Sequence, residues 1–402
     1  MDLLDKIRAL AVRAMQLGVG AGDIPGDTVI DEVLSPGEVV IGGRPTLMFG
    51  SNNYFGLTFH PEVIAAAEHA LRQYGTATTG SRIANGTLRL HRELEADFAR
   101  LFEKRRGMIF TTGHQANLSV IAGFCGPDDV VLIDAESHAS IYDGARLSGA
   151  QLLWFRHNSP ENLEQKLKRL PGRDRNRLVV VEGLYSIHGD VSPLAEIVEV
   201  CRRHQAYLLL DEAHSFGLYG DRGRGWAEAQ GVLPHIDFIV GTFSKALAGI
   251  GGFCVSDHPE LQGLHFTARA YLFTASGPPA SVAGVRAALK LISEDRSFRD
   301  RLWANTRRFR AGLEACGFSI GPCESPLVPI KIGPERTTIG FWRTLLARGV
   351  YTNVVLPPAV RKDECLLRAS CSAMHSAEQI DRALSIFALA GQEAGVLAAA
   401  PR

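Results

Sequence analysis

Two residues of complementary chemistry follow two apolar segments near the middle of the chain. Asp211 ends the apolar run at 206–210, and Lys245 comes shortly after the run at 238–241. A lysine amine can form a Schiff base with an aldehyde, and a carboxylate can keep a pyridine nitrogen protonated so that the ring accepts electrons. A carboxylate beside buried leucines also needs a cationic partner, which a pyridinium would supply. The pair therefore predicts a site for pyridoxal 5'-phosphate (PLP), carried by Lys245.

Residues that could bind the phosphate of this cofactor lie beside the lysine and after an earlier apolar run. Gly113 and His114 follow the run that ends at Phe110, where a helix is expected to begin. Backbone N–H groups at a helix start bind anions without any net charge. Thr242 and Ser244 add hydroxyl groups next to the lysine. The segment 111–114, which also contains Thr111 and Thr112, and the pair Thr242 and Ser244 are therefore the candidates for binding the phosphate.

Three further polar side chains also come just past apolar runs. His138 follows the run that ends at Asp134, and an imidazole there could stack on the cofactor ring or exchange protons near neutral pH. Ser186 and His214 could hydrogen-bond the phenolic oxygen of the ring. A purely structural role for each of these three residues is the alternative.

Other interpretations of the same segments find less support in the sequence. Residues 211–214 read Asp-Glu-Ala-His, as in the DEAH box of helicases, but the sequence contains no Walker A loop. A metal site would need a third His or Cys at a recognisable spacing from Asp211, Glu212 and His214, and none is present. No metal is therefore expected. A solvated lysine and a helix-capping aspartate are the remaining alternative for the first pair.

The surrounding pattern predicts the elements that must position these residues. Short apolar runs alternate with helical segments between about 60 and 260, which is typical of strands buried on both faces of a mostly parallel α/β sheet. Such sheets bind ligands at the carboxyl ends of their strands. We expect an N-terminal arm at 1–45, with a hairpin turn at Gly42 and Gly43, a large PLP-binding domain at 46–290, and a small C-terminal α+β domain at 291–402.

The composition is that expected of a soluble protein with a large core. Of the 402 residues 46% are hydrophobic, and 43 basic side chains balance 43 acidic ones, so no bulk charge favours nucleic acid or an acidic membrane. Seven scattered cysteines without C-x-x-C spacing favour a reducing cytoplasm over disulfides or zinc. Neither a signal peptide nor a membrane span is expected.

The first segment has the pattern of an amphipathic helix. Its apolar residues are Leu3, Leu4, Ile7, Leu10 and Val12. We expect this face to pack against the body of the protein or a partner subunit, and peripheral membrane contact is the alternative.

Five motifs, taken in order, resemble those of the α-oxoamine synthases. They are Asn-Tyr-Phe-Gly at 53–56, Gly-Ser-Arg at 80–82 with Asn-Gly-Thr at 85–87, Ser-His-Ala-Ser at 137–140, Asp-Glu-Ala-His-Ser at 211–215 and Gly-Thr-Phe-Ser-Lys at 241–245. The resemblance runs from about Leu47 to His375, and segments 138–144, 155–158 and 271–276 look most like bacterial serine palmitoyltransferases. It implies a PLP-dependent transferase of fold type I, similar to aspartate aminotransferase, that condenses an amino acid with an acyl thioester and releases carbon dioxide. It also implies a homodimer with shared active sites.

The resemblance further implies a role for each candidate residue. Lys245 would bind PLP and later remove the Cα proton of the substrate, Asp211 would pair with the pyridine nitrogen, and His138 would stack on the ring. Ser186 and His214 would contact the phenolic oxygen. The implied phosphate ligands are Gly113, His114, Thr242, Ser244 and, from the partner subunit, Thr274. Asn53 would line the substrate pocket.

Arg368 matches the family's position for a fork-shaped donor to the substrate carboxylate. The leading hypothesis is the condensation of L-serine with a long-chain acyl-CoA, such as palmitoyl-CoA, to 3-ketosphinganine, the first step of sphingolipid synthesis. Leu356 stands before a Pro-Pro pair where soluble bacterial serine palmitoyltransferases tend to carry Arg, so serine specificity rests on Arg368.

Related activities remain alternatives. They use glycine or alanine, as in amino-oxononanoate synthase, 2-amino-3-ketobutyrate CoA ligase and aminolevulinate synthase, or an acyl-carrier-protein thioester. A catalytically silent subunit is a further alternative, against which Lys245 argues.

Overall fold

The computed structural model describes residues 2–16, 25–170, 176–322 and 325–398. The chain forms two compact units, of which the smaller combines Met1–Ser51 with Arg301–Arg402 and the larger is Asn52–Asp300. The N-terminal segment belongs to the smaller unit because its strand β3 (Arg44–Met48) pairs in parallel with β12 (Val350–Tyr351). The first segment of the smaller unit ends at Ser51 and the larger unit ends at Asp300, compared with the expected divisions at 45 and 290, and the segment predicted as an arm is grouped with the smaller unit.

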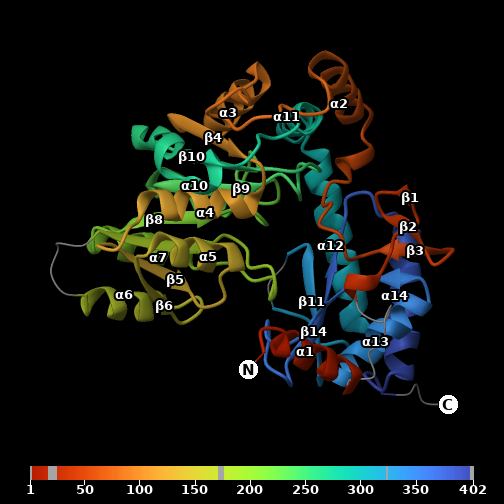
Figure 1. Ribbon diagram of the computed structural model, residues 1–402. Helices are drawn as coiled ribbons and strands as arrows, with labels where there is room; N and C mark the ends of the chain where they lie inside the picture. The colour runs from red at the N-terminus through yellow and green to blue at the C-terminus, as the bar shows by residue number, and fades with distance from the viewer. Residues whose placement is uncertain (1, 17–24, 171–175, 323–324, 399–402) are drawn as a thin grey trace. The chain divides into compact units, whose positions relative to one another are not determined.

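The larger unit is built around a sheet that has, in the described part of the chain, seven strands in the order β4-β10-β9-β8-β7-β5-β6 (Figure 1). The strands are β4 (Arg106–Phe110), β5 (Val130–Asp134), β6 (Gln151–Phe155), β7 (Arg177–Glu182), β8 (Tyr207–Asp211), β9 (Phe238–Thr242) and β10 (Gly252–Ser256). Neighbours from β9 to β6 are parallel, whereas β10 is antiparallel to both β9 and β4. The predicted mostly parallel α/β sheet is confirmed.

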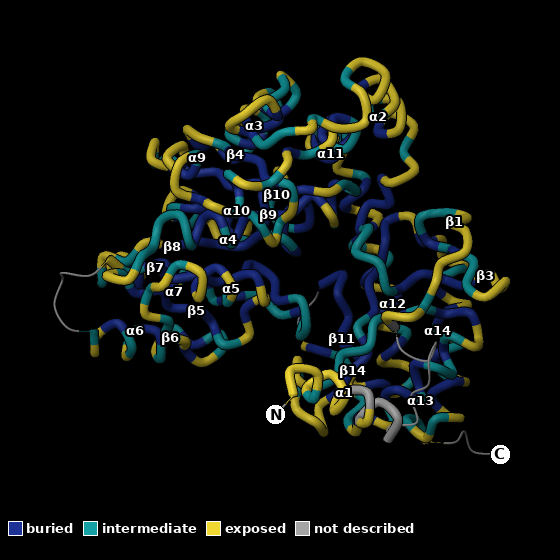
Figure 2. Tube along the Cα trace, viewed as in Figure 1, coloured by how far each residue is buried: buried dark blue, intermediate teal, exposed yellow. Residues whose placement is uncertain are grey.

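Helices cover both faces of this sheet, which explains why its strands are apolar along their whole length. One face packs against α4 (Gly113–Phe124), α5 (Ala139–Ser148), α9 (Leu264–Thr267) and α10 (Arg269–Leu272) in one buried cluster. On the opposite face, Phe98 of α3 (Arg89–Leu101) stacks 4.2 Å from Phe253 of β10. Figure 2 shows these strands as buried segments between helices that are exposed on their outer sides.

Other helices complete the larger unit. They are α2 (Pro61–Tyr74), α6 (Pro160–Lys168), α7 (Leu194–Arg203), α8 (Trp226–Ala229) and α11 (Pro279–Glu294). The long helix α12 (Ser297–Ala315) begins here and continues into the smaller unit.

The register of the sheet aligns the strand ends that carry polar residues. Glu182 at the end of β7 is paired with Asp211 at the end of β8, and Asp211 is paired in turn with Val240 of β9. Because β4, β5, β7, β8 and β9 all point the same way, the loops that follow them leave from one edge of the sheet. Ligands of open α/β sheets bind at this edge.

In its described residues, the smaller unit contains two sheets and helices packed on them. The first sheet has the order β1-β2-β3-β12, with β1 (Glu32–Ser35) and β2 (Glu38–Ile41), and the second has the order β11-β14-β13, with β11 (Leu327–Gly333), β13 (Asn353–Val355) and β14 (Cys365–Ser370). Its helices include α1 (Asp5–Gln16), α13 (Glu335–Ala347) and α14 (Ala377–Glu393).

The hairpin between β2 and β3 turns at Gly42 and Gly43, whose φ angles of 55° and 73° are the left-handed values that glycine adopts freely. The predicted hairpin is thus confirmed. Nowhere among the described residues does a helix have both the length and the apolarity needed to cross a membrane.

Candidate active site

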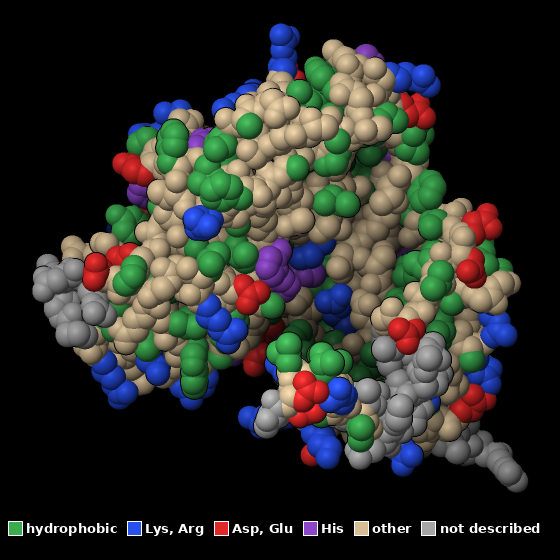
Figure 3. Space-filling view, in the orientation of Figure 1, with side chains coloured by type: hydrophobic (Ala, Val, Ile, Leu, Met, Phe, Trp, Pro, Cys, Tyr) green, Lys and Arg blue, Asp and Glu red, His purple; other side chains and the backbone are tan. Residues whose placement is uncertain are grey.

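A cavity of about 280 Å³ lies in the larger unit, at the sheet edge where the parallel strands end. The predicted site residues that line it are Lys245, Asp211, His138, His214, Gly113, His114, Thr242 and Ser244. Figure 3 shows histidine side chains gathered on the surface beside α4 and α5, where the side chain of His114 is 47% exposed. Segments from four different loops therefore meet around one cavity.

Asp211 places a buried carboxylate in this cavity at the end of β8. The residue is 5% exposed, and its Oδ2 accepts a hydrogen bond of 2.7 Å from Nδ2 of Asn117 in α4. Its Oδ1 accepts a hydrogen bond of 2.8 Å from the backbone N–H of Ala213. These two donors hold the carboxylate in one orientation, from which it can stabilise a cationic group in the cavity.

Glu182 adds a second carboxylate beside Asp211. Its Oε1 accepts a 2.5 Å hydrogen bond from the backbone N–H of His138. Burial, and after it the charge of Asp211, raises the pKa of Glu182 well above its usual value. This shift favours the protonated form of Glu182, which reduces the repulsion between the two carboxyl groups at the end of the sheet.

The first turn of α4 forms an anion-binding cradle against the end of β9. The helix is capped by Thr112, whose Oγ1 accepts a 3.0 Å hydrogen bond from the backbone N–H of Gln115. A Cβ atom added to Gly113 would lie 2.6 Å from Cβ of Thr242, so glycine alone permits this close approach. Oγ1 of Thr242 lies 2.9 Å from Oγ of Ser244. A helix start beside two hydroxyl groups is suited to a phosphate.

Replacing Gly113 with alanine is expected to weaken PLP binding about tenfold or more, because overpacking costs ~1–3 kcal/mol. Titration of the apoprotein with PLP measures the dissociation constant. Gly340→Ala in α13 is the matched control, since a Cβ there meets no atom within 4 Å. An unchanged PLP affinity in Gly113→Ala would contradict the cradle.

His157 ties the loop after β7, which carries Ser186, to the sheet. Its Nδ1 lies 2.8 Å from Oδ1 of Asp134 at the end of β5, and its Nε2 lies 2.8 Å from Oδ2 of Asp190 in the loop. Burial by itself would lower the pKa of His157, but the hydrogen bonds to Asp134 and Asp190 outweigh it and raise the pKa to about 10. The ring is thus a cation that donates to a carboxylate on each side. Ser186 itself does not line the cavity, and its contact with the cofactor stays a prediction.

The charged hydrogen bonds of His157 to Asp134 and Asp190 make the stability of the folded chain depend on pH. The pKa of His157 is about 10 in the folded chain and about 6.5 when unfolded. Its contribution to the free energy of unfolding is therefore complete at pH values below the pKa of the unfolded chain. The contribution is lost as the pH rises through the pKa of the folded chain. We expect His157→Gln to cost on the order of 2–3 kcal/mol at pH 7 and much less at pH 10.5.

Urea unfolding midpoints at the two pH values measure this difference. His258→Gln is the control, because Nε2 of His258 faces one carboxylate, that of Asp237 at 2.9 Å. Equal losses at pH 7 and pH 10.5 for His157→Gln would disprove the assignment of a charged ring.

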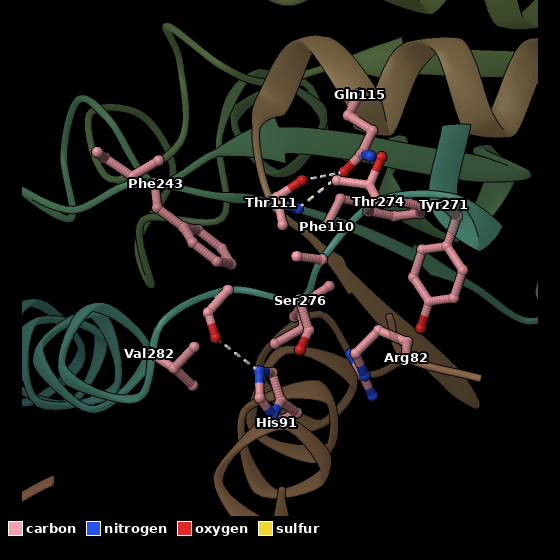
Figure 4. A pocket seen from close by; sticks show the side chains of 14 residues that line it. Arg82, His91, Phe110, Thr111, Gln115, Phe243, Tyr271, Thr274, Ser276 and Val282 are labelled. Atoms are coloured by element: carbon pink, nitrogen blue, oxygen red, sulfur yellow. Dashed lines mark hydrogen bonds between the residues drawn. The ribbon is translucent and has the colours of Figure 1, made fainter. Parts of the chain in front are cut away.

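Three other predicted residues do not line this cavity. Asn53 donates from Nδ2 to Oγ1 of Thr58 at 2.8 Å. Thr274 lies in a neighbouring pocket of the same unit, beside Gln115 (Figure 4). Arg368 lies on β14 of the smaller unit. Their roles toward substrate and cofactor stay predictions.

The site also involves residues to which the sequence assigned no role. Asn117, Ser140 and Glu182 line the cavity, and outside its lining Tyr54 places its hydroxyl 2.8 Å from Nδ1 of His214. Asn117 could have been found from the sequence, because it follows Gly113 by four residues in a largely apolar helix. Residues at this spacing lie on the same face of a helix. The contact between Tyr54 and His214 joins residues 160 positions apart and has no such signal.

The residues of the cavity fit PLP. Lys245 offers the amine that attaches its aldehyde, the buried carboxylate of Asp211 suits a pyridinium, and the cradle at Gly113 suits its phosphate. All three lie around one cavity, as a single small cofactor requires.

Comparison with known proteins agrees with this chemistry. The family model of aminotransferase class I and II matches residues 44–387. A serine palmitoyltransferase of Caulobacter vibrioides is 49% identical over 99% of this chain and 98% of its own. A structure of serine palmitoyltransferase with PLP has a TM-score of 0.95 at 42% identity, with 99% of this chain and 100% of that one covered. The enzyme from Sphingomonas wittichii gives the same TM-score, identity and coverage. The chain therefore belongs to the PLP-dependent class I and II aminotransferase family and, within it, to the α-oxoamine synthases.

Proposed function

We propose that this protein condenses L-serine with a long-chain acyl-CoA, such as palmitoyl-CoA, to give 3-ketosphinganine, carbon dioxide and free CoA. The observation that carries the proposal is the cavity in which Lys245, Asp211 and His138 meet beside the anion cradle of α4. The similarity of the whole chain to serine palmitoyltransferases supports the choice of substrates. The new bond joins Cα of serine to the acyl carbon. The bond between the acyl carbon and the sulfur of CoA breaks, and so does the bond between Cα and the carboxylate, which leaves as carbon dioxide.

Several residues of the cavity have a part in this proposed reaction. PLP, when bound, supplies the aldehyde that takes up the amino acid and the ring that draws electrons from Cα. Asp211 holds the proton on the ring nitrogen, and Nζ of Lys245 removes the proton from Cα and returns one after carbon dioxide has left. His138 would lie over the bound ring and exclude water on that side. The first turn of α4 anchors the phosphate, so that Lys245 and the reacting carbon stay aligned.

Arg368 is proposed to bind the serine carboxylate. A guanidinium can form two parallel N–H bonds with a carboxylate and so determine which bond at Cα stands perpendicular to the ring. On β14, Arg368 is paired with Asn353 of β13 and Pro329 of β11, so its backbone is held from both sides. Leu356 follows β13 and offers no charge of its own.

We propose a cytoplasmic homodimer with shared active sites. Free thiols at Cys125, Cys201, Cys254, Cys316, Cys365 and Cys371 are compatible with a reducing compartment, and Cys323 lies outside the described residues. Thr274, which lies in a separate pocket of its own chain, would reach the phosphate of the partner's cofactor.

The segment around α1 is proposed to contact a partner subunit or, as the alternative, a membrane surface. Its apolar residues Leu3, Leu4, Ile7 and Val12 are between 53% and 90% exposed. The side chain of Leu10 lies outside the described part of the structure.

Substrate binding by the PLP-loaded protein tests the proposed function. Serine, glycine and alanine are added separately while the cofactor absorbance is followed, and thiol release is then measured with short and long acyl-CoA and with an acyl-carrier-protein thioester. We expect the absorbance change with serine and the fastest thiol release with palmitoyl-CoA. A response to glycine or alanine but not to serine would point to another α-oxoamine synthase, such as amino-oxononanoate synthase, and would refute the proposal. A colourless protein that PLP cannot reconstitute would instead indicate a silent subunit.

A further inference from the structure

A chain of hydrogen bonds connects the carboxylate of Asp211 to the imidazole of His138. Nδ2 of Asn117 lies 2.7 Å from Oδ2 of Asp211 and 2.9 Å from Oγ of Ser140. Oγ of Ser140 lies 2.8 Å from Nδ1 of His138, and the backbone N–H of Ser140 donates to the same Nδ1 at 3.2 Å. Asn117 and Ser140 are 2% and 0% exposed, so water does not interrupt the chain.

The positions of the hydrogens in this chain follow from what each group can donate. An ionised Asp211 only accepts, so Asn117 must turn its NH₂ group toward it and uses its second hydrogen on Oγ of Ser140. The Ser140 hydroxyl, which accepts there, is free to direct its own hydrogen at Nδ1 of His138. Nδ1 then receives two hydrogens and carries none. The imidazole is therefore the neutral form with its proton on Nε2.

Protonation of His138 would break this pattern. A hydrogen on Nδ1 would face the backbone N–H of Ser140, which cannot turn away. The hydroxyl of Ser140 would have to turn its own hydrogen aside and accept from Nδ1 as well as from Asn117. Such a clash of donors disfavours the cation independently of any long-range charge.

The groups around His138 act together with this hydrogen-bond pattern. They are Asp211 at the end of β8, Glu182 at the end of β7, Lys245, His114 of α4 and Asp143 of α5. His138 is exposed toward the cavity, but loss of water around its ring is the main cause that lowers its pKa. The charges of Lys245 and His114 lower the pKa further, whereas Asp211 and Asp143 act in the opposite direction.

We propose that Asn117 and Ser140 are positioning residues that use the negative charge of Asp211 to hold His138 neutral, with its proton on Nε2. The benefit for catalysis rests on the proposed function, although the hydrogen-bond pattern does not. A cationic ring stacked on a pyridinium would repel it and would compete for the charge of Asp211. A neutral His138 leaves that charge to the cofactor, which keeps the ring nitrogen protonated.

Histidine hydrogen–deuterium exchange followed by mass spectrometry tests this proposal in the apoprotein. The exchange of the imidazole C2 hydrogen depends on pH and reports the protonation midpoint of His138 without substrate or turnover. Ser140→Ala removes the hydroxyl donor, and Asn117→Leu frees that hydroxyl to rotate. We expect both to raise the midpoint by about one pH unit, the value of one hydrogen bond, and Ser140→Thr to restore it.

Ser137→Ala is the matched control, because Ser137 is a buried neighbour whose hydroxyl has no hydrogen-bond partner among the described residues.

With PLP and substrates, the acid limb of the pH profile of kcat/KM should move to higher pH in Ser140→Ala, together with the protonation midpoint of His138. Ser140 and Asn117 lie on different helices, so both variants are measured in case one misfolds. An unchanged midpoint in a folded Ser140→Ala or Asn117→Leu protein would overturn the proposal. A protein that does not use serine would refute the proposed function and leave the exchange result standing.

Discussion

Replacing Lys245 with alanine is expected to lower kcat/KM for the condensation by at least about 10⁴-fold, because one amine both attaches the cofactor and moves the Cα proton. No other lysine lines the cavity, so none among the described residues can take over this role. The variant should also lose covalent attachment of PLP after borohydride treatment, which mass spectrometry of the intact chain detects.

The control for Lys245→Ala is Lys290→Ala, which removes an exposed lysine of α11 in the same unit. It should keep both turnover and covalent attachment. If Lys245→Ala retained more than a hundredth of the wild-type turnover, the assignment of Lys245 would be wrong.

Replacing Asp211 with asparagine is expected to lower kcat/KM by about 10³-fold, because a neutral amide cannot hold the proton on the ring nitrogen. The amide of Asn117, which donates to Oδ2 at 2.7 Å, would in addition face a group that no longer carries charge. PLP should still bind, since the phosphate cradle of α4 and the amine of Lys245 are unchanged. Steady-state kinetics and a PLP titration therefore separate loss of chemistry from loss of cofactor.

The neighbouring carboxylate of Glu212 provides the matched control. Glu212 is also buried, but it accepts hydrogen bonds from the backbone N–H groups of Trp226 and Ala227 at 2.8 and 2.9 Å and does not line the cavity. Burial raises its pKa to about 7, so the carboxyl is about half ionised at neutral pH, and Glu212→Gln removes a buried carboxylate next to Asp211 without touching the cavity. Turnover of Asp211→Asn close to that of Glu212→Gln would show that the ring nitrogen needs no carboxylate.

The sheet and the cofactor half of the site could be predicted from the sequence because both depend on local patterns. Apolar runs marked the strands, and a polar residue after each run marked the edge where ligands bind. Asp211, Lys245 and Gly113 were found in this way, and the structure brings them around one cavity. The antiparallel strand β10 was not anticipated, since an apolar run carries no sign of its direction.

Residues whose importance depends on a distant partner could not be found from local patterns. Glu182 and Ser140 matter because the sheet register and the α4–α5 contact place them beside Asp211 and Asn117. The pairing of β3 with β12 joins the two ends of the chain and likewise had no local signal. Arg368 was assigned through the family resemblance, and its role toward the substrate is still a prediction.

The most direct test of the central claim follows the carboxyl carbon of serine through the reaction. L-Serine labelled with ¹³C in the carboxylate is incubated with palmitoyl-CoA and the PLP-loaded protein, while labelled carbon dioxide, free thiol and the lipid product are measured. We expect one labelled carbon dioxide and one thiol per unlabelled 3-ketosphinganine formed. A product that retains the label, or thiol release without labelled carbon dioxide, would contradict it.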